Sequence, residues 1–313
     1  MQKPVREISQ HEAPDRIKAI GLMIAAVSLF SCLDTTAKYL YSVVQLPLSQ
    51  IVWMRFAGQF AAMIIVLGAV SLPRLLQTRK LGYQVLRSLL LLGATLFNFQ
   101  ALRFLQLDQA ATIMFLVPLT VALLAGPLLG EWVGWRRLAA IFVGFLGILV
   151  VMRPGYGGFH PAMAYSLAAM LSVSLFGLAT RYLASYDRAE NTLFYSMFAG
   201  IVLVGPLAFM EWTWPRDGFA WLLMLSLGLW AGLGHYLFIL AHRWAPASSI
   251  APFIYVQLVV VSVLGFAIFG DLPDLWTLAG SAIIVASGIY LLHRERVTGR
   301  AAVATEAQDG SAS

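Results

Sequence analysis

The stretch QAATIMFLVPLTVALLAGPLLG, residues 109–130, contains no charged side chain. A helix that crosses a lipid bilayer needs about 20 consecutive, mostly apolar residues, and this stretch has that length. Its apolar residues run continuously, whereas the strands of a membrane β-barrel would alternate apolar and polar residues over roughly ten positions. The stretch therefore predicts a transmembrane helix.

Apolar runs of comparable length recur along the whole chain. The weakest is LAAIFVGFLGILVVM, residues 138–152, which can still span a bilayer if Arg136, Arg137 and Arg153 extend toward the two surfaces. We expect an all-α integral membrane protein with ten transmembrane helices. Besides 109–130, the predicted helices cover residues 17–41, 49–70, 83–104, 135–152, 162–185, 191–210, 218–241, 247–270 and 275–293.

The composition excludes a soluble globular protein. Hydrophobic residues make up 60% and charged residues 12% of the 313 residues, and the mean hydropathy is +0.79. Soluble domains have roughly half their residues apolar and about a quarter charged, so this chain has too few polar side chains to cover a water-facing surface. The formal net charge of +6 is not gathered into one stripe, which argues against nucleic acid as a partner.

Motifs for catalysis, cofactors and metals are missing from the sequence. It has no GxxxxGK[ST], HExxH or GxSxG motif, and its five histidines are scattered along the chain. The single cysteine, Cys32, cannot form a disulfide within the chain. We therefore expect no enzyme activity, no cofactor and no metal site.

The distribution of positive charge predicts the orientation in the membrane. With the N-terminus in the cytoplasm, sixteen of the 21 lysines and arginines fall in inner segments, and two, Lys38 and Arg55, fall inside spans. The remaining three, Arg103, Arg153 and Arg216, fall on the outer side. Because inner segments of membrane proteins carry an excess of positive charge, we expect both termini in the cytoplasm of a multi-pass inner (plasma) membrane protein.

An internal repeat divides the chain into two halves. ALRFLQLDQAATIMFLVPLTVALLAGPLLGE (101–131) aligns without a gap with AHRWAPASSIAPFIYVQLVVVSVLGFAIFGD (241–271), with six identical pairs at an offset of 140. Each half would hold five helices, an odd number, so the second half should enter the membrane from the opposite side. Inverted repeats are typical of secondary transporters, which bind substrate near the midplane between the halves, and a duplicated scaffold protein is the alternative. The predicted organisation is a cytoplasmic tail at 1–16, a first five-helix repeat at 17–152, a second at 162–293 and a disordered cytoplasmic tail at 298–313.

The ends of the two halves carry a family signature. GEWVGWRRLAAIFVGFLGILVVMRPG (130–155) and GDLPDLWTLAGSAIIVASGIYLL (270–292) resemble the sequence that closes each half of EamA-type transporters of the drug/metabolite transporter superfamily. The resemblance departs from the usual pattern at Ala140, which replaces a glycine, and in the second acid, which is an aspartate. The residues that carry the resemblance are Gly130, Glu131, Gly147, Gly270, Asp271 and Gly288.

The resemblance implies ten helices in an inverted 5+5 arrangement and a secondary transporter that moves small metabolites by alternating access. Within the family the chain resembles YddG-type amino-acid exporters, so we expect export of amino acids, including aromatic or apolar ones. The alternative is an importer of a cofactor-like metabolite, similar to riboflavin or S-adenosylmethionine; a membrane enzyme or a scaffold is an alternative of another class. The expected partners are a small-molecule substrate and the lipid bilayer, and the chain is compatible with a monomer or a homodimer.

Two charged residues interrupt the first predicted helix. Asp34 and Lys38 are four residues apart and share a helix face, and charged groups inside a membrane are costly and usually functional. Either the two residues pair and face a polar interior, or Lys38 extends to the outer surface. Arg55, near the start of the second helix, can pair with Asp34 or bind a substrate carboxylate with two hydrogen bonds. We expect Asp34, Lys38 and Arg55 to form a gate or an anion contact near the outer mouth.

A second set of candidate residues lies deeper in the predicted helices. Tyr255 and its repeat mate Phe115 occupy equivalent positions, so we expect their rings to face each other between the halves. Such rings would suit an apolar or cationic substrate, although aromatic stripes also occur in plain helix packing. Asn98 and Gln257 are polar groups that need partners, and Trp230 can stack on a substrate or anchor the bundle. The predicted substrate-binding residues are Phe115, Tyr255, Trp230, Asn98 and Gln257.

Overall fold

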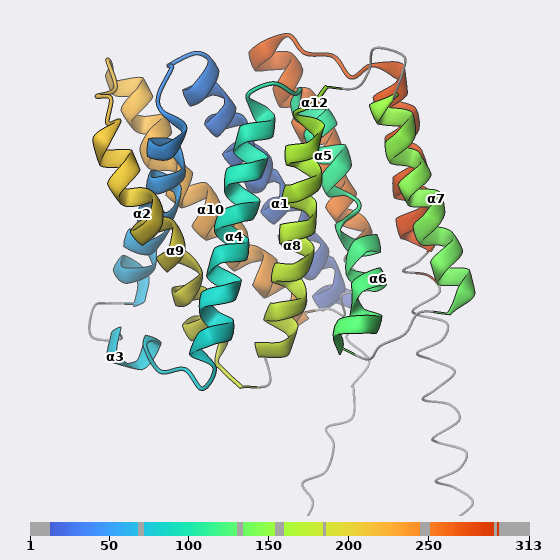
Figure 1. Ribbon diagram of the computed structural model, residues 1–313, viewed down its shortest axis with the longest axis horizontal. Helices are drawn as coiled ribbons and strands as arrows, with labels where there is room; N and C mark the ends of the chain where they lie inside the picture. The colour runs from blue at the N-terminus through green and yellow to red at the C-terminus, as the bar shows by residue number, and fades with distance from the viewer. Residues whose placement is uncertain are drawn as a thin grey trace, which may run out of the picture.

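The computed structural model describes residues 13–67, 72–129, 134–153, 160–183, 186–244, 251–290 and 293, and every regular element within them is a helix (Figure 1). The predicted tails at 1–16 and 298–313 lie outside these residues, except that α1 already begins at Ala13. The helices are α1 (Ala13–Ser42), α2 (Leu48–Leu67), α3 (Leu72–Leu75), α4 (Leu81–Leu102), α5 (Leu107–Met114), α6 (Val117–Leu129), α7 (Trp135–Met152), α8 (Met163–Leu183), α9 (Ala189–Met210), α10 (Gly218–Trp244), the 3₁₀-helix η2 (Ala251–Tyr255) and α12 (Val256–Phe269). A final helix covers Leu275–Tyr290.

The described helices have the length and composition of membrane spans. Seven of them contain apolar stretches long enough to cross a bilayer, and three shorter apolar helices cover Leu138–Met152, Phe253–Phe269 and Leu275–Tyr290. These ten segments coincide with the ten ranges that the sequence predicts. The prediction of a helical, multi-pass membrane protein is confirmed, while ten complete crossings remain a prediction because three of the segments are short.

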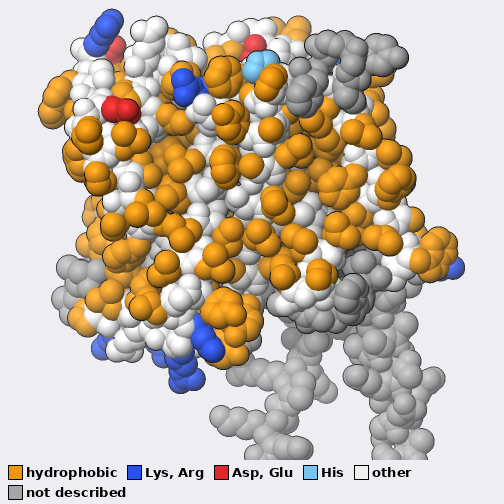
Figure 2. All heavy atoms as spheres, in the orientation of Figure 1, with side chains coloured by type: hydrophobic (Ala, Val, Ile, Leu, Met, Phe, Trp, Pro, Cys, Tyr) orange, Lys and Arg blue, Asp and Glu red, His pale blue; other side chains and the backbone are white. Residues whose placement is uncertain are grey.

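The surface has the pattern of a protein embedded in lipid. Figure 2 shows hydrophobic side chains across the broad middle of one face, with the charged side chains near its upper and lower edges. Large apolar side chains on the surface of the helices, such as Phe142, Val202 and Val263, are exposed to 64%, 59% and 60%. In water such a surface would be unstable, but in hydrocarbon it costs nothing, so it marks the lipid-facing zone.

Two predicted helices contain an irregular turn, and the irregular turns occupy equivalent positions in the repeat. The predicted helix over 109–130 is divided into α5 and α6, because Pro118 has no N–H and its ring clashes with the carbonyl of Met114, where α5 ends. In the second half the predicted helix over 247–270 is the 3₁₀-helix η2 followed by α12, and residues 245–250 lie outside the described part. Phe115 follows α5, and Tyr255 is the last residue of η2 before α12 begins, so these two repeat mates each lie at an irregular turn.

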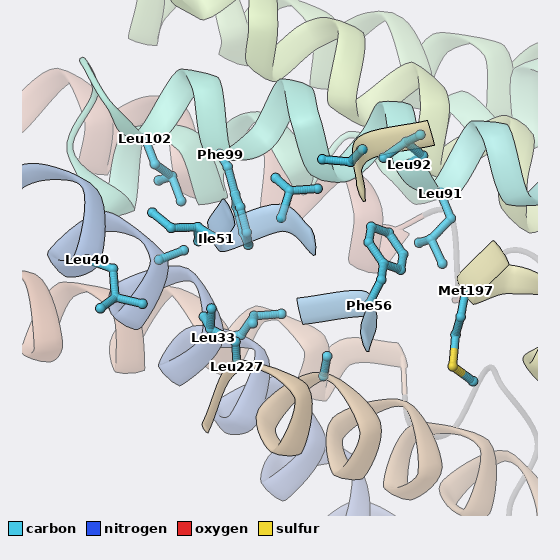
Figure 3. Packing of buried hydrophobic residues seen from close by; sticks show 14 of the residues in the cluster. Leu33, Leu40, Ile51, Phe56, Leu91, Leu92, Phe99, Leu102, Met197 and Leu227 are labelled. Carbon is cyan, nitrogen blue, oxygen red and sulfur yellow. The ribbon is translucent and has the colours of Figure 1, made fainter. Parts of the chain in front are cut away.

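The helices of the two halves interleave. α1 packs along α10, α4 packs along α8 and α9, and α2 packs along both α9 and α10. The main core cluster lies between these helices, and Figure 3 shows the ring of Phe56 extending toward Leu91 and Leu92 of α4 and Met197 of α9. α1, α2, α4 and α10 therefore surround a common interior, and their inward side chains form the candidate site described below.

Glycines bring α2 and α10 into backbone contact. A Cβ added at Gly228 of α10 would lie 2.3 Å from the carbonyl carbon and 2.4 Å from the Cα of Gly58 of α2. Those distances are far below a normal contact, so only hydrogen atoms fit between the two helices. Small residues at such crossings let membrane helices approach closely and gain van der Waals packing.

We predict that Gly228→Ala lowers the melting temperature of the detergent-solubilised protein, because the new methyl group must push the α2 backbone away. Overpacking of this kind costs roughly 1–3 kcal/mol. The matched control is Gly177→Ala in α8, where a Cβ meets nothing within 4 Å. That substitution should keep or raise the melting temperature, because alanine favours helices over glycine by about 0.5–1 kcal/mol. Equal melting temperatures for the two variants would contradict the close approach of α2 and α10.

Candidate functional site

Polar side chains from α1, α2, α4 and α10 meet inside the helix bundle. Asn98 of α4 donates a hydrogen bond from Nδ2 to Oδ1 of Asp34 in α1, at 2.9 Å. Arg55 of α2 donates from Nη1 to the hydroxyl oxygen of Thr95, one turn from Asn98 in α4, at 2.5 Å. His235 of α10 lies within electrostatic range of Arg55, as does Asp34. We call the group formed by Asp34, Arg55, Gln59, Thr95, Asn98 and His235 the interior polar cluster.

Helix periodicity explains how the cluster is assembled. Thr95 and Asn98 are three residues apart on α4, and Arg55 and Gln59 are four residues apart on α2, so each pair occupies one helix face. Both faces turn inward, where Arg55 and Gln59 are only 5% and 3% exposed. The cluster thus consists of two helix faces that each present polar groups to the interior.

Two buried polar atoms of the cluster have no hydrogen-bond partner among the described residues. They are the Nε donor of Arg55 and the Oε1 acceptor of Gln59. Arg55 and Asp34 do not form an ion pair with each other either. Among the described residues, the ion pairs within 4.0 Å are Lys38–Asp271 and Arg153–Asp274. Since buried polar groups are nearly always satisfied in native proteins, a free donor and a free acceptor one helical turn apart offer hydrogen bonds to a polar molecule or to water.

Aromatic side chains border the cluster. The ring of His235 meets the ring of Phe30 of α1 edge to face, with 5.0 Å between ring centroids. The Nδ1 atom of His235 lies 2.8 Å from the carbonyl oxygen of Ala231, and Phe30 packs over Gly234. Trp230, a predicted substrate contact, is half-buried on the same helix and packs against the main core cluster. The polar centre is therefore flanked by flat apolar rings.

Asp34 and Lys38, whose pairing is one of the two arrangements that the sequence allows, bond other residues. Lys38 donates from Nζ to Oδ2 of Asp271 at 3.0 Å and to the carbonyl oxygen of Leu105 at 3.0 Å. Asp34 lies one turn deeper and bonds Asn98 instead. The long lysine side chain reaches a partner near the helix ends, where water can solvate it, so the two charges of α1 belong to different sites.

The second ion pair lies at the same end of the bundle. Arg153 donates from Nη2 to Oδ2 of Asp274 at 2.6 Å, and Oδ1 of Asp274 accepts the backbone N–H of Thr277 at 2.7 Å. Asp274 is thus the N-cap of the final helix. Burial raises the pKa of Asp274, but the hydroxyl and N–H of Thr277 together with Arg153 outweigh it and hold the pKa below its usual range. This carboxylate stays charged at neutral pH.

The predicted aromatic contact is present, but it lies in another part of the core. The rings of Phe115 and Tyr255 meet edge to face, with 5.2 Å between centroids and an interplanar angle of 82°. Both belong to a core cluster that differs from the one around the interior polar cluster. The hydroxyl of Tyr255 is buried without a partner among the described residues and lies directly against Gly288. Gln257 lies in the first turn of α12 and is half-buried.

The predicted site residues therefore divide into three groups. Asn98 joins Asp34 and Arg55, Phe115 contacts Tyr255, and Lys38 bonds Asp271. Gln59 and Thr95 were not expected from the sequence, although both are polar residues within apolar spans, and that signal could have found them. Among the described residues, no group of three or more side chains is arranged to hold a metal ion.

Comparison with known proteins gives one consistent result. Residues 17–153 and 160–293 match the EamA-like transporter family. The S-adenosylmethionine uptake transporter of Rickettsia felis is 27% identical over 283 residues, covering 90% of this chain and 94% of that protein. The riboflavin transporter of Vibrio cholerae is 25% identical over 280 residues, covering 87% and 92%. A solved crystal structure has the same fold, with a TM-score of 0.60, 21% identity, and coverage of 89% of this chain and 98% of that one.

We predict that Lys38 is energetically coupled to Asp271 and much less to Asp34. In a double-mutant cycle on melting temperature, Lys38→Gln and Asp271→Asn should show an interaction of about 0.5–3 kcal/mol, because each single change leaves an uncompensated charge. The matched cycle of Lys38→Gln with Asp34→Asn should show a smaller interaction. A larger coupling to Asp34 than to Asp271 would contradict the pairing seen in the structure.

Proposed function

The chain belongs to the EamA-like transporter family, and on this premise we propose that it is a secondary transporter for a small metabolite that carries an α-amino acid group. The family makes the chain a multi-pass membrane transporter of small molecules, which in bacteria lies in the inner membrane. The observation that carries the proposal is the unpartnered donor of Arg55 beside the unpartnered acceptor of Gln59.

The interior polar cluster offers complementary partners for both charges of an amino acid. A substrate carboxylate would accept from the guanidinium of Arg55, whose fork-like geometry suits bidentate binding of carboxylates. A substrate ammonium would donate to Oε1 of Gln59 and be attracted by the carboxylate of Asp34. In this arrangement the substrate completes the charge balance of the cluster, and the free energy of desolvating Arg55 and Asp34 is recovered when it binds.

S-adenosylmethionine is the first substrate to test. It has an α-amino acid end for the cluster and an adenine ring, for which the flat faces of Phe30 and His235 provide stacking partners. The Rickettsia relative, an uptake transporter named for this molecule, supports it and supports uptake as the direction. Free amino acids, whose export the resemblance to amino-acid exporters implies, carry the same two charges and are the second candidate. Riboflavin has neither an ammonium nor a carboxylate and therefore fits the cluster less well.

The packing supports alternating access between two inverted halves. α1 and α8 are the first helices of the two predicted repeats, and α4 and α10 are the third. α1 packs on α10, and α8 packs on α4. Each contact thus joins the first helix of one repeat to the third helix of the other, as expected for two repeats related by a two-fold axis. The irregular turns at Phe115 and Tyr255 follow the same rule, and helices with irregular turns are a common feature of the sites of inverted-repeat carriers. The interior polar cluster would then be exposed to one side at a time.

The predicted orientation has a direct chemical test. We place both termini in the cytoplasm, supported by the excess of positive charge in inner segments. In a Cys32→Ser background, a cysteine at Thr213 should react from outside intact cells with a membrane-impermeant thiol reagent. A cysteine at Gln77, in the turn after α3, should react only after the cells are opened. The reverse pattern would overturn the orientation.

The transport proposal predicts that proteoliposomes take up labelled S-adenosylmethionine or L-methionine. Arg55→Lys keeps the positive charge but loses the planar guanidinium that can bond a carboxylate twice. KM for the transported compound should therefore rise about tenfold, as expected for the loss of one charge-assisted hydrogen bond. Gln59→Leu, which removes the free acceptor, should also raise KM. The matched control is Arg103→Lys, because Arg103 lies after α4, where it stacks on Tyr41 and bonds Gln100.

The competitors in this assay identify the recognised group. Excess unlabelled amino acid should inhibit uptake, whereas the corresponding amine without a carboxylate and the corresponding acid without an amino group should not. Uptake of riboflavin without uptake of either amino-acid compound would replace the proposal. An unchanged KM in Arg55→Lys would remove Arg55 from the binding site.

A further inference from the structure

A second arginine is buried inside the bundle, away from the interior polar cluster. Arg87 of α4 is 6% exposed, and its guanidinium lies over the ring of Phe176 of α8, at 4.1 Å from the centroid. Its Nε donates to the hydroxyl oxygen of Thr180 in α8 at 2.6 Å. Its Nη1 donates to the carbonyl oxygen of Thr192 in α9 at 2.8 Å and to the hydroxyl oxygen of Ser196. All of these acceptors are neutral.

No carboxylate neutralises Arg87 among the described residues. Asp187 bonds Gln84, which lies one turn before Arg87 in α4, but within the described part of the chain its oxygens accept only from Thr78, from the backbone N–H of Arg79 at 2.9 Å and from Gln84 at 2.8 Å. Burial raises the pKa of Asp187, but these hydrogen bonds and the charge of Arg79 hold the pKa below its usual value, so its charge is engaged there. A buried guanidinium without a counter-charge is expensive inside a membrane, which makes a functional role the first hypothesis.

The position of Arg87 connects it to the proposed substrate site. Arg87, Leu91, Thr95 and Asn98 follow one another at intervals of four, four and three residues, so they occupy one face of α4. At 1.5 Å per residue, Arg87 lies about 12 Å along the helix from Thr95, the partner of Arg55. It also lies where α4 of the first half meets α8 and α9 of the second, which is the kind of interface that opens in an inverted-repeat carrier.

We propose that Arg87 is a second anion-binding station, which holds the carboxylate of the transported molecule on the predicted cytoplasmic side of the interior polar cluster. The proposal rests on the proposed function and adds a step to it. When α4 separates from α8 and α9, the hydroxyls of Thr180 and Ser196 leave the guanidinium, and a carboxylate takes their place. The exchange is favourable because the carboxylate supplies the counter-charge that the guanidinium lacks and can bond it through two parallel N–H···O contacts.

The test compares loading from the two faces of the membrane. Labelled L-methionine and S-adenosylmethionine are offered to right-side-out and to inside-out vesicles that contain the wild-type protein, Arg87→Lys or Arg87→Gln. If Arg87 is a station, Arg87→Gln raises KM for loading from the cytoplasmic face about tenfold or more and changes KM from the outer face less than about twofold. Arg87→Lys, which keeps the charge, gives an intermediate rise. The matched control Arg103→Lys changes neither.

A variant that keeps Arg87 distinguishes a loss of substrate binding from a folding defect. Thr180→Val is close in shape and leaves the Nε of Arg87 without its hydroxyl partner, so KM from the cytoplasmic face should fall or stay unchanged. If the Arg87 and Thr180 variants instead lower the melting temperature and the maximal rate in both directions with KM unchanged, Arg87 only holds α4 against α8 and α9, and the proposal is overturned. If wild-type vesicles load neither compound from either face, the proposed function fails and the station fails with it.

Discussion

A charged side chain inside a lipid bilayer has no bulk water to solvate it, so the fold must bring a polar partner to it. In this chain one helix supplies those partners at several depths. In α4, Asn98 bonds Asp34 of α1 and Thr95 bonds Arg55 of α2. At the opposite end of α4, the charged residue is Arg87, which donates to hydroxyls of α8 and α9. The central position of α4 follows from this constraint, because α1, α2, α8 and α9 must all reach it to satisfy their polar groups.

The sequence was sufficient for the helices because membrane spans are determined locally. Length and apolarity located the helices, and the repeat brought Phe115 and Tyr255 to equivalent positions, where their rings do meet. The irregular turns beside them were not predicted, although Pro118 was visible in the sequence. A proline in an apolar run is compatible with a kink or with an interruption, and the packing of the neighbouring helices decides between the two.

The site was harder to predict because its contacts connect residues that are distant in the chain. The spacing of Asp34 and Lys38 allowed a local pair, but Lys38 is bonded to Asp271, 233 residues away. The sequence near Lys38 gives no sign of Asp271 as its partner, because only the tertiary fold brings the two residues together. Gln59 was not predicted for a related reason. A single amide in an apolar span does not indicate a binding site until Arg55, one turn before it, is also seen to have an unpartnered donor.

The contact between Gly58 and Gly228 has a mechanical consequence. Two helices whose backbones touch cannot approach further, and a side chain at either position would hold them apart. α2 and α10 belong to different predicted halves of the molecule, so in the proposed alternating-access mechanism this contact is a point about which one half can turn against the other. Used as a fulcrum, it would widen one end of the bundle while the other end narrows.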